Sequence, residues 1–438
     1  MVEVDYVVCG DYLLTMVEGD EVITNGAVAV KGTRILSTGP YEEIIERFIP
    51  EKVIGGSGKV VLPGLINTHT HAAMVYFRGI ADDLPLKEWL EKYIWPAESK
   101  WLSTGFCADA VTLACVEMLK SGVTTYNDMY FFQDGAAGVT KEIGMRAVLG
   151  VGVLDFPSVS AKNTEEYLAN AEVFLDKWKG DGLITPCVAP HAPYTCGPET
   201  FKKARTLAEK YDVPLHTHLA ETRYEVDTIR ERFGKTPVGY LDEIGFLDSR
   251  LVAAHCVWVD DKDIGILSRR GVGVSHCVES NLKLASGISP VARMLREGVK
   301  VTFGTDGAAS NNDLDIFTEM SIAARLHKAI AGDPTVLDAR QTLAMATRVG
   351  AEVLGLGSSV GTLAPGKAAD IVVADLKKPH LTPFYDIYSL IVYSMRASDV
   401  DTVIVDGKIL VQNRKTLTAD EGAVMEKAWW WKNRIAPG

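Results

Sequence analysis

Hydrophobic positions in the middle of the chain alternate between short apolar runs and stretches with helical spacing. The apolar runs begin near residues 61, 124, 147, 185, 214, 251, 272 and 301. Apolar residues recur every three or four positions over 201–211, after a start at Pro198, and a second helix is predicted from Pro290 to Gly298. Eight strands that alternate with helices favour an α/β fold of the (β/α)8 TIM-type barrel kind. The alternative is an open doubly wound sheet, but no GxGxxG segment follows an early strand.

The two ends of the chain have a different pattern, in which turn residues separate short β-rich segments. Strands are expected at 5–8, 13–16, 26–30, 34–38 and 369–374, and in a hairpin over 400–411 that turns at Asp406-Gly407. Because both ends share this character, we expect them to form one small β-sandwich domain. The predicted division is 1–60 and 360–438 for this composite domain with its C-terminal tail, and 61–359 for the barrel.

A long insert separates the first two predicted barrel strands. Their starts, near residues 61 and 124, lie further apart than those of any other consecutive pair. Apolar residues within the insert predict an amphipathic helix over 86–94 that ends at Trp95-Pro96. A long connection at the C-terminal mouth of a barrel can form a lid or specificity loop, and a packed surface insertion is the alternative.

Composition narrows the classes of partner. The 438 residues carry 45 basic and 57 acidic side chains, a formal net charge of −12, so we expect neither nucleic acid nor a membrane as partner. The seven cysteines form no CxxC pair, which fits a reducing compartment. No run of about 18 apolar residues and no signal peptide is evident. We therefore expect a cytoplasmic protein that acts on a small molecule. The run Trp429-Trp430-Trp431 fits packing or a subunit contact, and a homo-oligomer is expected.

Four of the nine histidines form two HxH pairs at predicted strand ends. His69-Thr70-His71 follows the apolar run 60–66, the first predicted barrel strand, and His216-Thr217-His218 ends the fifth. Side chains two residues apart on a strand face the same way, so each pair can direct both imidazoles into the barrel mouth. Barrel enzymes carry their catalytic residues at that end.

Three more residues follow predicted strands, namely His191 after the fourth, His255 after the sixth and Asp306 after the eighth. Three imidazoles and one carboxylate suit Zn²⁺ or Fe²⁺ with a water in an open position. Spacing alone does not decide whether His216 or His218 would be the ligand. The fourth predicted strand contains no lysine that could bridge two ions, so one divalent metal ion per chain is expected.

The segments around these residues resemble the amidohydrolase superfamily over nearly the whole chain. Residues 61–71 (VLPGLINTHTH) are similar to its opening motif, and residues 366–375 (GKAADIVVAD) are similar to its closing motif. Within the superfamily, the chain is most similar to the 5-methylthioadenosine/S-adenosylhomocysteine deaminases. That closer resemblance lies in four segments, 81–98, 218–221, 280–287 and 304–310.

The resemblance implies a role for each candidate residue. The metal ligands, most consistent with Zn²⁺, would be His69, His71, His218 and Asp306. Substrate contacts would fall on Glu98, His191, Glu221 and Asp306, with Trp89 packing against the nucleoside. His216 would then be a packing or supporting residue. His276 stands before Cys277-Val278, where the family commonly has Asn-Pro, and this departure concerns the local loop.

The implied reaction is hydrolytic deamination of the adenine ring of 5′-methylthioadenosine, adenosine or S-adenosylhomocysteine. The metal would lower the pKa of its bound water towards about 7. Asp306 would take the water proton, His255 would orient the nucleophile, and Glu221 would protonate purine N1. Glu98 suits the ribose hydroxyls, because a carboxylate can accept from two neighbouring O–H groups.

Other functions fit part of this evidence. A guanine, other purine base or s-triazine aminohydrolase or chlorohydrolase would share the metal site but would not need Glu98 for ribose. A catalytically dead scaffold need not keep the complete set of residues. Among nucleosides, a neutral 5′ group is expected to suit the site. The third predicted strand carries only Arg146, at its far end, and residues 155–163 offer only Lys162 as a cation.

Overall fold

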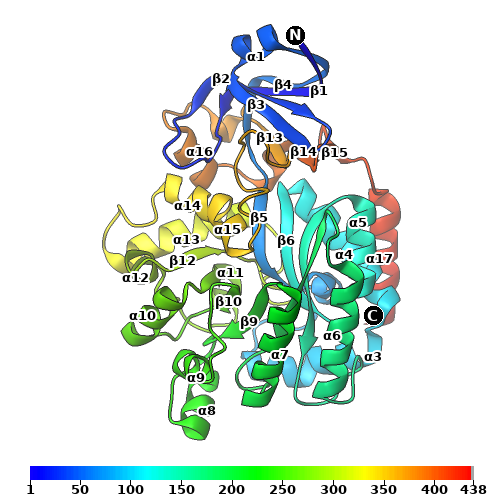
Figure 1. The fold of residues 1–438 in the computed structure, drawn as a ribbon, viewed down its shortest axis with the longest axis vertical. Helices are drawn as coiled ribbons and strands as arrows, with labels where there is room; N and C mark the ends of the chain where they lie inside the picture. The colour runs from blue at the N-terminus through cyan, green and yellow to red at the C-terminus, as the bar shows by residue number, and fades with distance from the viewer. Residues whose placement is uncertain (436–438) are drawn as a thin grey trace.

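The computed structural model describes residues 1–435, which form two eight-stranded sheets (Figure 1). One sheet has parallel neighbours in the order β12-β11-β10-β9-β8-β7-β6-β5. At its seam the Thr68 hydroxyl of β5 donates to the Phe303 carbonyl of β12 over 2.8 Å. The predicted (β/α)8 barrel is confirmed. Its strands are β5 (Leu65–Thr70), β6 (Val123–Tyr130), β7 (Arg146–Val153), β8 (Ile184–Pro190), β9 (Leu215–Leu219), β10 (Leu251–His255), β11 (Gly273–His276) and β12 (Lys300–Phe303).

Helices surround these strands (Figure 1). Two of the three helices that the sequence predicted are present as α7 (Pro198–Tyr211) and α12 (Val291–Arg296), and proline begins or precedes each of them. The helices that follow the insert are α4 (Thr104–Lys120), α5 (Gln133–Ile143), α6 (Thr164–Trp178), α7 (Pro198–Tyr211), α8 (Arg223–Phe233), α9 (Pro237–Glu243), α10 (Asp261–Arg270), α11 (Val278–Lys283), α12 (Val291–Arg296), α13 (Ile316–Ala331), α14 (Ala339–Met345) and α15 (Arg348–Val353).

The apolar run 60–66 is not one barrel strand, so the predicted position of the first barrel strand was wrong. β4 (Phe48–Pro63) belongs to the other sheet, and β5 begins at Leu65. The chain passes between the sheets at Gly64, where a Cβ atom would lie 1.9 Å from the Thr124 Oγ1 atom. Glycine therefore permits the close approach. As a result His69 lies on β5 itself rather than after the strand.

The second sheet joins both ends of the chain, as expected, in the order β16-β15-β14-β13-β4-β1-β2-β3. Figure 1 shows its blue and orange strands together at one end of the molecule. Val30, Ile35, Ile371 and Ile404 share one apolar cluster, so the predicted sandwich takes the form of a single curled sheet. Its elements are β1 (Val2–Leu13), β2 (Ile23–Lys31), β3 (Arg34–Pro40), α1 (Tyr41–Arg47), β4, β13 (Ile371–Asp375), α16 (Ile387–Tyr393), β14 (Val400–Val405), β15 (Lys408–Gln412) and β16 (Lys415–Thr416).

Two details of this region differ from expectation or stay open. The strand predicted at 5–8 is longer than expected, because β1 continues past an irregularity between Gly10 and Tyr12 in its pairing with β4 and ends at Leu13. The separate strand predicted at 13–16 is wrong, since residues 14–16 belong to no strand. The predicted hairpin is present as β14 and β15, with φ of 48° at Asp406 and 76° at Gly407. The domain division at 60/61 and 359/360 stays a prediction, and its last three residues, 436–438, lie outside the described residues.

The insert is helical but does not end at Trp95-Pro96. The helix continues as α2 (Leu86–Trp89), a π turn η2 (Leu90–Ile94) and α3 (Trp95–Trp101). Proline lacks the N–H group that an α-helix would use here, and the wider π turn before Pro96 accommodates that loss. The predicted helix is therefore extended to Trp101, and residues from each part line the same cavity.

The C-terminal helix α17 (Glu421–Ile435) packs beside α4 (Figure 1). Its Trp431 donates to the Asp109 carboxylate over 2.9 Å and packs on Phe106, whereas Trp429 and Trp430 are exposed. Within residues 1–435, no single helix meets the length and hydropathy needed to cross a membrane. One bent pair, Leu86–Trp101 with Thr104–Lys120 at 113°, does so by length and composition only.

Candidate functional site

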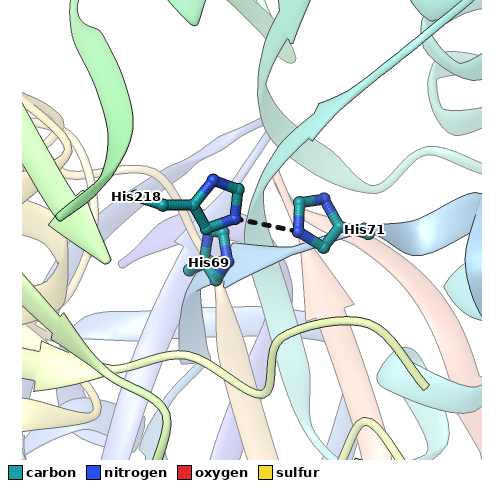
Figure 2. A group of neighbouring side chains, drawn as sticks. All are labelled: His69, His71 and His218. Atoms are coloured by element: carbon teal, nitrogen blue, oxygen red, sulfur yellow. Dashed lines mark hydrogen bonds between the residues drawn. The ribbon is translucent and has the colours of Figure 1, made fainter. Parts of the chain in front are cut away.

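Three histidines from two barrel strands meet at the mouth of the barrel. His69 lies near the end of β5, His71 directly follows that strand, and His218 lies on β9. One ring nitrogen from each lies within 4.8 Å of the others. Figure 2 shows the three rings directed toward one another. The prediction from the HxH spacing is therefore confirmed for the first pair, since the imidazoles of His69 and His71 both enter the barrel mouth.

The ring nitrogens that face this space carry lone pairs. His71 Nδ1 lies 2.6 Å from the Met129 carbonyl and His218 Nδ1 lies 2.8 Å from the His191 carbonyl. A carbonyl only accepts, so each Nδ1 carries a proton. The two Nε2 atoms, 3.1 Å apart, then present lone pairs to each other (Figure 2).

His69 completes this arrangement. Its Nε2 atom is buried and has no hydrogen-bond partner within residues 1–435, while its Nδ1 atom contacts His216 Nε2 at 2.8 Å. Burial lowers the pKa of His69 to about 4 and holds that of His218 well below its usual range. Three imidazole nitrogens that converge on one point repel one another if each presents a lone pair, and a cation between them removes this repulsion, so these residues fit a divalent metal ion.

Asp306 supplies a carboxylate at the same point. Its Oδ1 atom lies 3.4 Å from His69 Nε2 and 3.3 Å from His71 Nε2. Its Oδ2 atom accepts hydrogen bonds from Ser280 and Ser310 at 2.7 and 2.9 Å. Burial favours the neutral acid, but the close approach of the His69, His71 and His255 rings outweighs it and holds the pKa of Asp306 well below its usual range.

Glu221 and His255 form a second pair beside this cluster. His255 Nδ1 contacts Asn281 Oδ1 at 2.9 Å, and its Nε2 atom lies 3.9 Å from Glu221 Oε2. Burial raises the pKa of Glu221. Burial also opposes protonation of His255, but the carboxylates of Glu221 and Asp306 outweigh it and raise its pKa. Both shifts favour the protonated forms, so the pair suits proton transfer.

Glu98 approaches the site from α3 of the insert. Its Oε1 atom accepts a hydrogen bond from Tyr130 at 2.6 Å, and burial raises its pKa to about 7. Trp89 of α2 is 4% exposed and lines the same cavity. His191 follows β8, and its Nδ1 atom contacts Thr195 Oγ1 at 2.8 Å. Burial lowers the pKa of His191 to about 3, so its ring is neutral.

These side chains line one cavity of about 500 Å³. His71, His218, Glu221, His255 and Asp306 are among the lining residues, together with Trp89, Glu98 and His191. The wall away from the histidines is mostly apolar and is formed by Leu86, Leu90, Trp95, Phe131, Leu154, Phe156, Pro157 and Val159. No lysine or arginine within the described residues lines it. A cavity of this size and character suits a small organic ligand.

The sequence predicted that the site residues lie at the barrel mouth, but it did not identify the residues that hold them there by hydrogen bonds. Tyr130 was not identified, although it ends a predicted strand, which was the available signal. Ser280, Asn281 and Ser310 lie inside the similar segments but received no role. Single serines and asparagines are too common in any sequence to signal one. His276 points elsewhere, since its Nε2 atom contacts His327 at 3.0 Å.

Known proteins match this chain over nearly its full length, a span that includes every residue of the site. Residues 60–410 match the amidohydrolase family. A protein of Thermodesulfovibrio yellowstonii named 5-methylthioadenosine/S-adenosylhomocysteine deaminase is 54% identical over 434 residues, 98% of each chain. A 5′-deoxyadenosine deaminase of Methanosarcina acetivorans is 46% identical and aligns with 97% of this chain and 96% of its own length. The crystal structure of an adenosine deaminase from Xanthomonas campestris with bound zinc is similar at a TM-score of 0.98 and 40% identity, over 99% of both chains.

Proposed function

The chain belongs to the amidohydrolase family and is an aminohydrolase, and from this we propose that it deaminates the adenine ring of 5′-methylthioadenosine, adenosine or S-adenosylhomocysteine. The products are the inosine analogue and ammonia. The observation that carries the proposal is the meeting of three imidazoles beside Glu221 and His255, at a cavity of about 500 Å³. 5′-Deoxyadenosine, named for one relative, belongs to the same class.

We propose that His69, His71, His218 and Asp306 hold one Zn²⁺ ion per chain, with Fe²⁺ as the alternative. The buried, unpartnered Nε2 atom of His69 and the facing lone pairs of His71 and His218 support this ligand set. The ion would supply a nucleophile at neutral pH by lowering the pKa of a coordinated water.

The protein's own groups then manage the protons. Asp306, ionised at neutral pH, accepts the proton of the attacking water at Oδ1. Glu221, whose raised pKa keeps a proton available, donates to purine N1 as C6 becomes tetrahedral. His255, held by Asn281 through Nδ1, directs Nε2 toward Glu221 and stabilises negative charge that develops at the reacting centre. Asp306 then passes the water proton to N6, the C6–N6 bond breaks and ammonia leaves, while the proton of the C6 hydroxyl returns to Glu221 as the product carbonyl forms.

The nucleoside is proposed to lie between the histidines and the insert. Glu98, fixed by Tyr130, would accept from the ribose hydroxyls, and Trp89 would pack against the nucleoside. His191, neutral and held by Thr195, is placed to contact the substrate from β8. A site built for ribose explains why nucleosides, rather than free guanine or an s-triazine, are the proposed substrates.

The apolar outer wall bears on the 5′ substituent. Arg146, the cation of the third barrel strand, lies at the opposite end, where it is bound to Asp370 over 3.0 Å. With no lysine or arginine among the described lining residues, a carboxylate would lose hydration without gaining a partner. We therefore propose that uncharged 5′ groups, as in 5′-methylthioadenosine, are preferred over the amino-acid tail of S-adenosylhomocysteine.

A substrate panel tests the proposal directly. Ammonia release and the absorbance change from adenine to hypoxanthine are followed with adenosine, 5′-methylthioadenosine, S-adenosylhomocysteine, adenine, guanine and an s-triazine. Turnover of the nucleosides and not of the free bases supports it. Preferred turnover of a base or triazine would establish the alternative hydrolase, and no turnover by metal-loaded protein would favour a scaffold. The homo-oligomer, the cytoplasmic location and the two-domain division remain part of the proposal.

A further inference from the structure

A fully buried carboxylate lies directly behind the loop that carries Glu221. Glu225, in the first turn of α8, is 0% exposed and does not line the cavity. Its Oε1 atom accepts the backbone N–H of Ala220 at 2.8 Å, and its Oε2 atom accepts that of Glu221 at 3.0 Å. Both oxygens of one carboxylate are therefore used on two consecutive amides.

The backbone held in this way has an unfavourable conformation. Ala220 has φ of 51°, in the left-handed region that a Cβ atom disfavours. Successive N–H groups that point to the same side form a concave site for an acceptor, and the carboxyl group of Glu225 fills it. Burial raises the pKa of Glu225 to about 8, and the Ala220 and Glu221 amides oppose that shift. On the other side the Ala220 carbonyl accepts from the N–H groups of Val257 and Trp258 at 3.0 and 2.9 Å. The segment is fixed from both sides.

The same contacts connect Glu221 with His255. Val257 and Trp258 belong to the loop that follows His255 at the end of β10. The Trp258 indole donates to the Ser286 carbonyl at 2.7 Å, and the Ser286 hydroxyl reaches Glu221 Oε1 at 3.4 Å. The loops that carry Glu221 and His255 thus share one hydrogen-bond network. Among the described residues, Glu225 is the only one whose side chain accepts from the Ala220 and Glu221 amides.

We propose that Glu225 is a positioning residue for the deamination. Its carboxylate fixes the backbone at Ala220 and Glu221, and this keeps the Glu221 side chain at its 3.9 Å separation from His255. Glu225 touches neither substrate nor metal ligand and acts through Glu221. The inference rests on the proposed function, because it requires Glu221 to be the proton donor.

The test is the Glu225→Gln variant of the full, metal-loaded protein. A glutamine side chain has nearly the same shape, but its NH₂ group cannot accept, so one amide loses its partner and faces another donor. We expect kcat with adenosine to fall about 10- to 100-fold, the usual cost of losing such a support. KM should change less than about threefold and metal content should stay constant, because the contacts to substrate and metal remain. Glu231→Gln, at an exposed position on the same helix, is the matched control.

A double-mutant cycle separates positioning from general stability. If Glu225 acts through Glu221, adding Glu225→Gln to Glu221→Gln should cost less than about threefold in kcat. Amide hydrogen exchange gives an independent measure, in which the segment containing Ala220 and Glu221 should exchange faster in Glu225→Gln than in wild type. If Glu225→Gln does not fold, Glu225→Asp replaces it, since it keeps both oxygens but sets them one methylene short of the amides.

Several results would overturn the inference. An equal loss in kcat in both backgrounds would mean a purely structural role, an unchanged kcat would mean no role, and a loss of metal would mean that Glu225 supports the ligands instead. Failure of the proposed function is distinguishable, because wild-type protein would then release no ammonia. An unaffected Glu221→Gln variant would remove the premise that Glu221 is the proton donor, whatever Glu225 does.

Discussion

The two ends of the cavity are built in different ways. At the inner end, hydrogen bonds fix the functional side chains, as when Met129 holds His71 and Ser280 holds Asp306. At the outer end, the insert and the loop after β7 meet through apolar contacts, such as Trp95 with Phe156 at a ring separation of 5.9 Å. Phe156 remains 37% exposed. The inner end is therefore rigid and suited to one reaction, whereas the outer end selects by polarity and size.

Removing the metal should have the largest effect on the inner end of the cavity. Because the lone pairs of His71 and His218 face each other at 3.1 Å, the cluster should bind a divalent ion tightly and lose all measurable activity on chelation. Activity should return with about one equivalent of Zn²⁺ per chain. Elemental analysis and titration of the metal-free protein measure this, and two tightly held ions would contradict the single-ion site.

Glu221→Gln should give the next largest effect at the inner end. The amide cannot donate an acidic proton to N1, so kcat should fall by about 10² to 10⁴, the usual range for general acid–base catalysis. Metal content and the thermal midpoint should stay near wild type, because the shape of the side chain is kept. Steady-state kinetics with elemental analysis provide the check. A variant that loses its metal would show that Glu221 is a ligand.

The sequence predicted the inner end better than the outer one for a physical reason. Histidines such as His69 and His218 are rare, and their place at strand ends follows from the barrel and the HxH spacing. The chain crossing at Gly64 depends on contact with Thr124, which is distant in sequence. The hydrogen bonds from the Ala220 and Glu221 amides to Glu225 depend on the backbone geometry of a loop, which the pattern of side chains in the sequence does not predict. Apolar walls have no distinctive residue type, so the outer end could be predicted only by its lack of cations.

The outer end is tested by the charge on the 5′ substituent. A missing charge-assisted contact is worth about 1.5 to 3 kcal/mol, so kcat/KM for S-adenosylhomocysteine should be about 10- to 100-fold below that for 5′-methylthioadenosine. Val159→Arg places a cation in the wall and should narrow this gap. Val173→Arg, at a position on α6 that is 68% exposed and away from the cavity, should leave it unchanged. Equal efficiency in wild type would mean that another cation, such as Lys162 or one from a neighbouring subunit, meets the tail.

The smallest expected effect is on KM and concerns Glu98, which connects the two ends of the cavity. This residue comes from the insert but contacts Tyr130 of the barrel. Burial raises its pKa to about 7, so in free enzyme the carboxyl is mostly neutral at pH 6 and mostly ionised at pH 8. Only the ionised form accepts from both ribose hydroxyls. KM for adenosine should therefore fall about tenfold as pH rises from 6 to 8, following the ionised fraction of Glu98.

The Glu98→Gln variant cannot ionise at this position and should lose this pH dependence, at a KM between the two wild-type limits. 2′,3′-Dideoxyadenosine lacks both hydroxyls and should show no such dependence with either protein. If its KM followed pH as that of adenosine does, the titrating group would act on the base or the metal site, and Glu98 would not be the ribose contact.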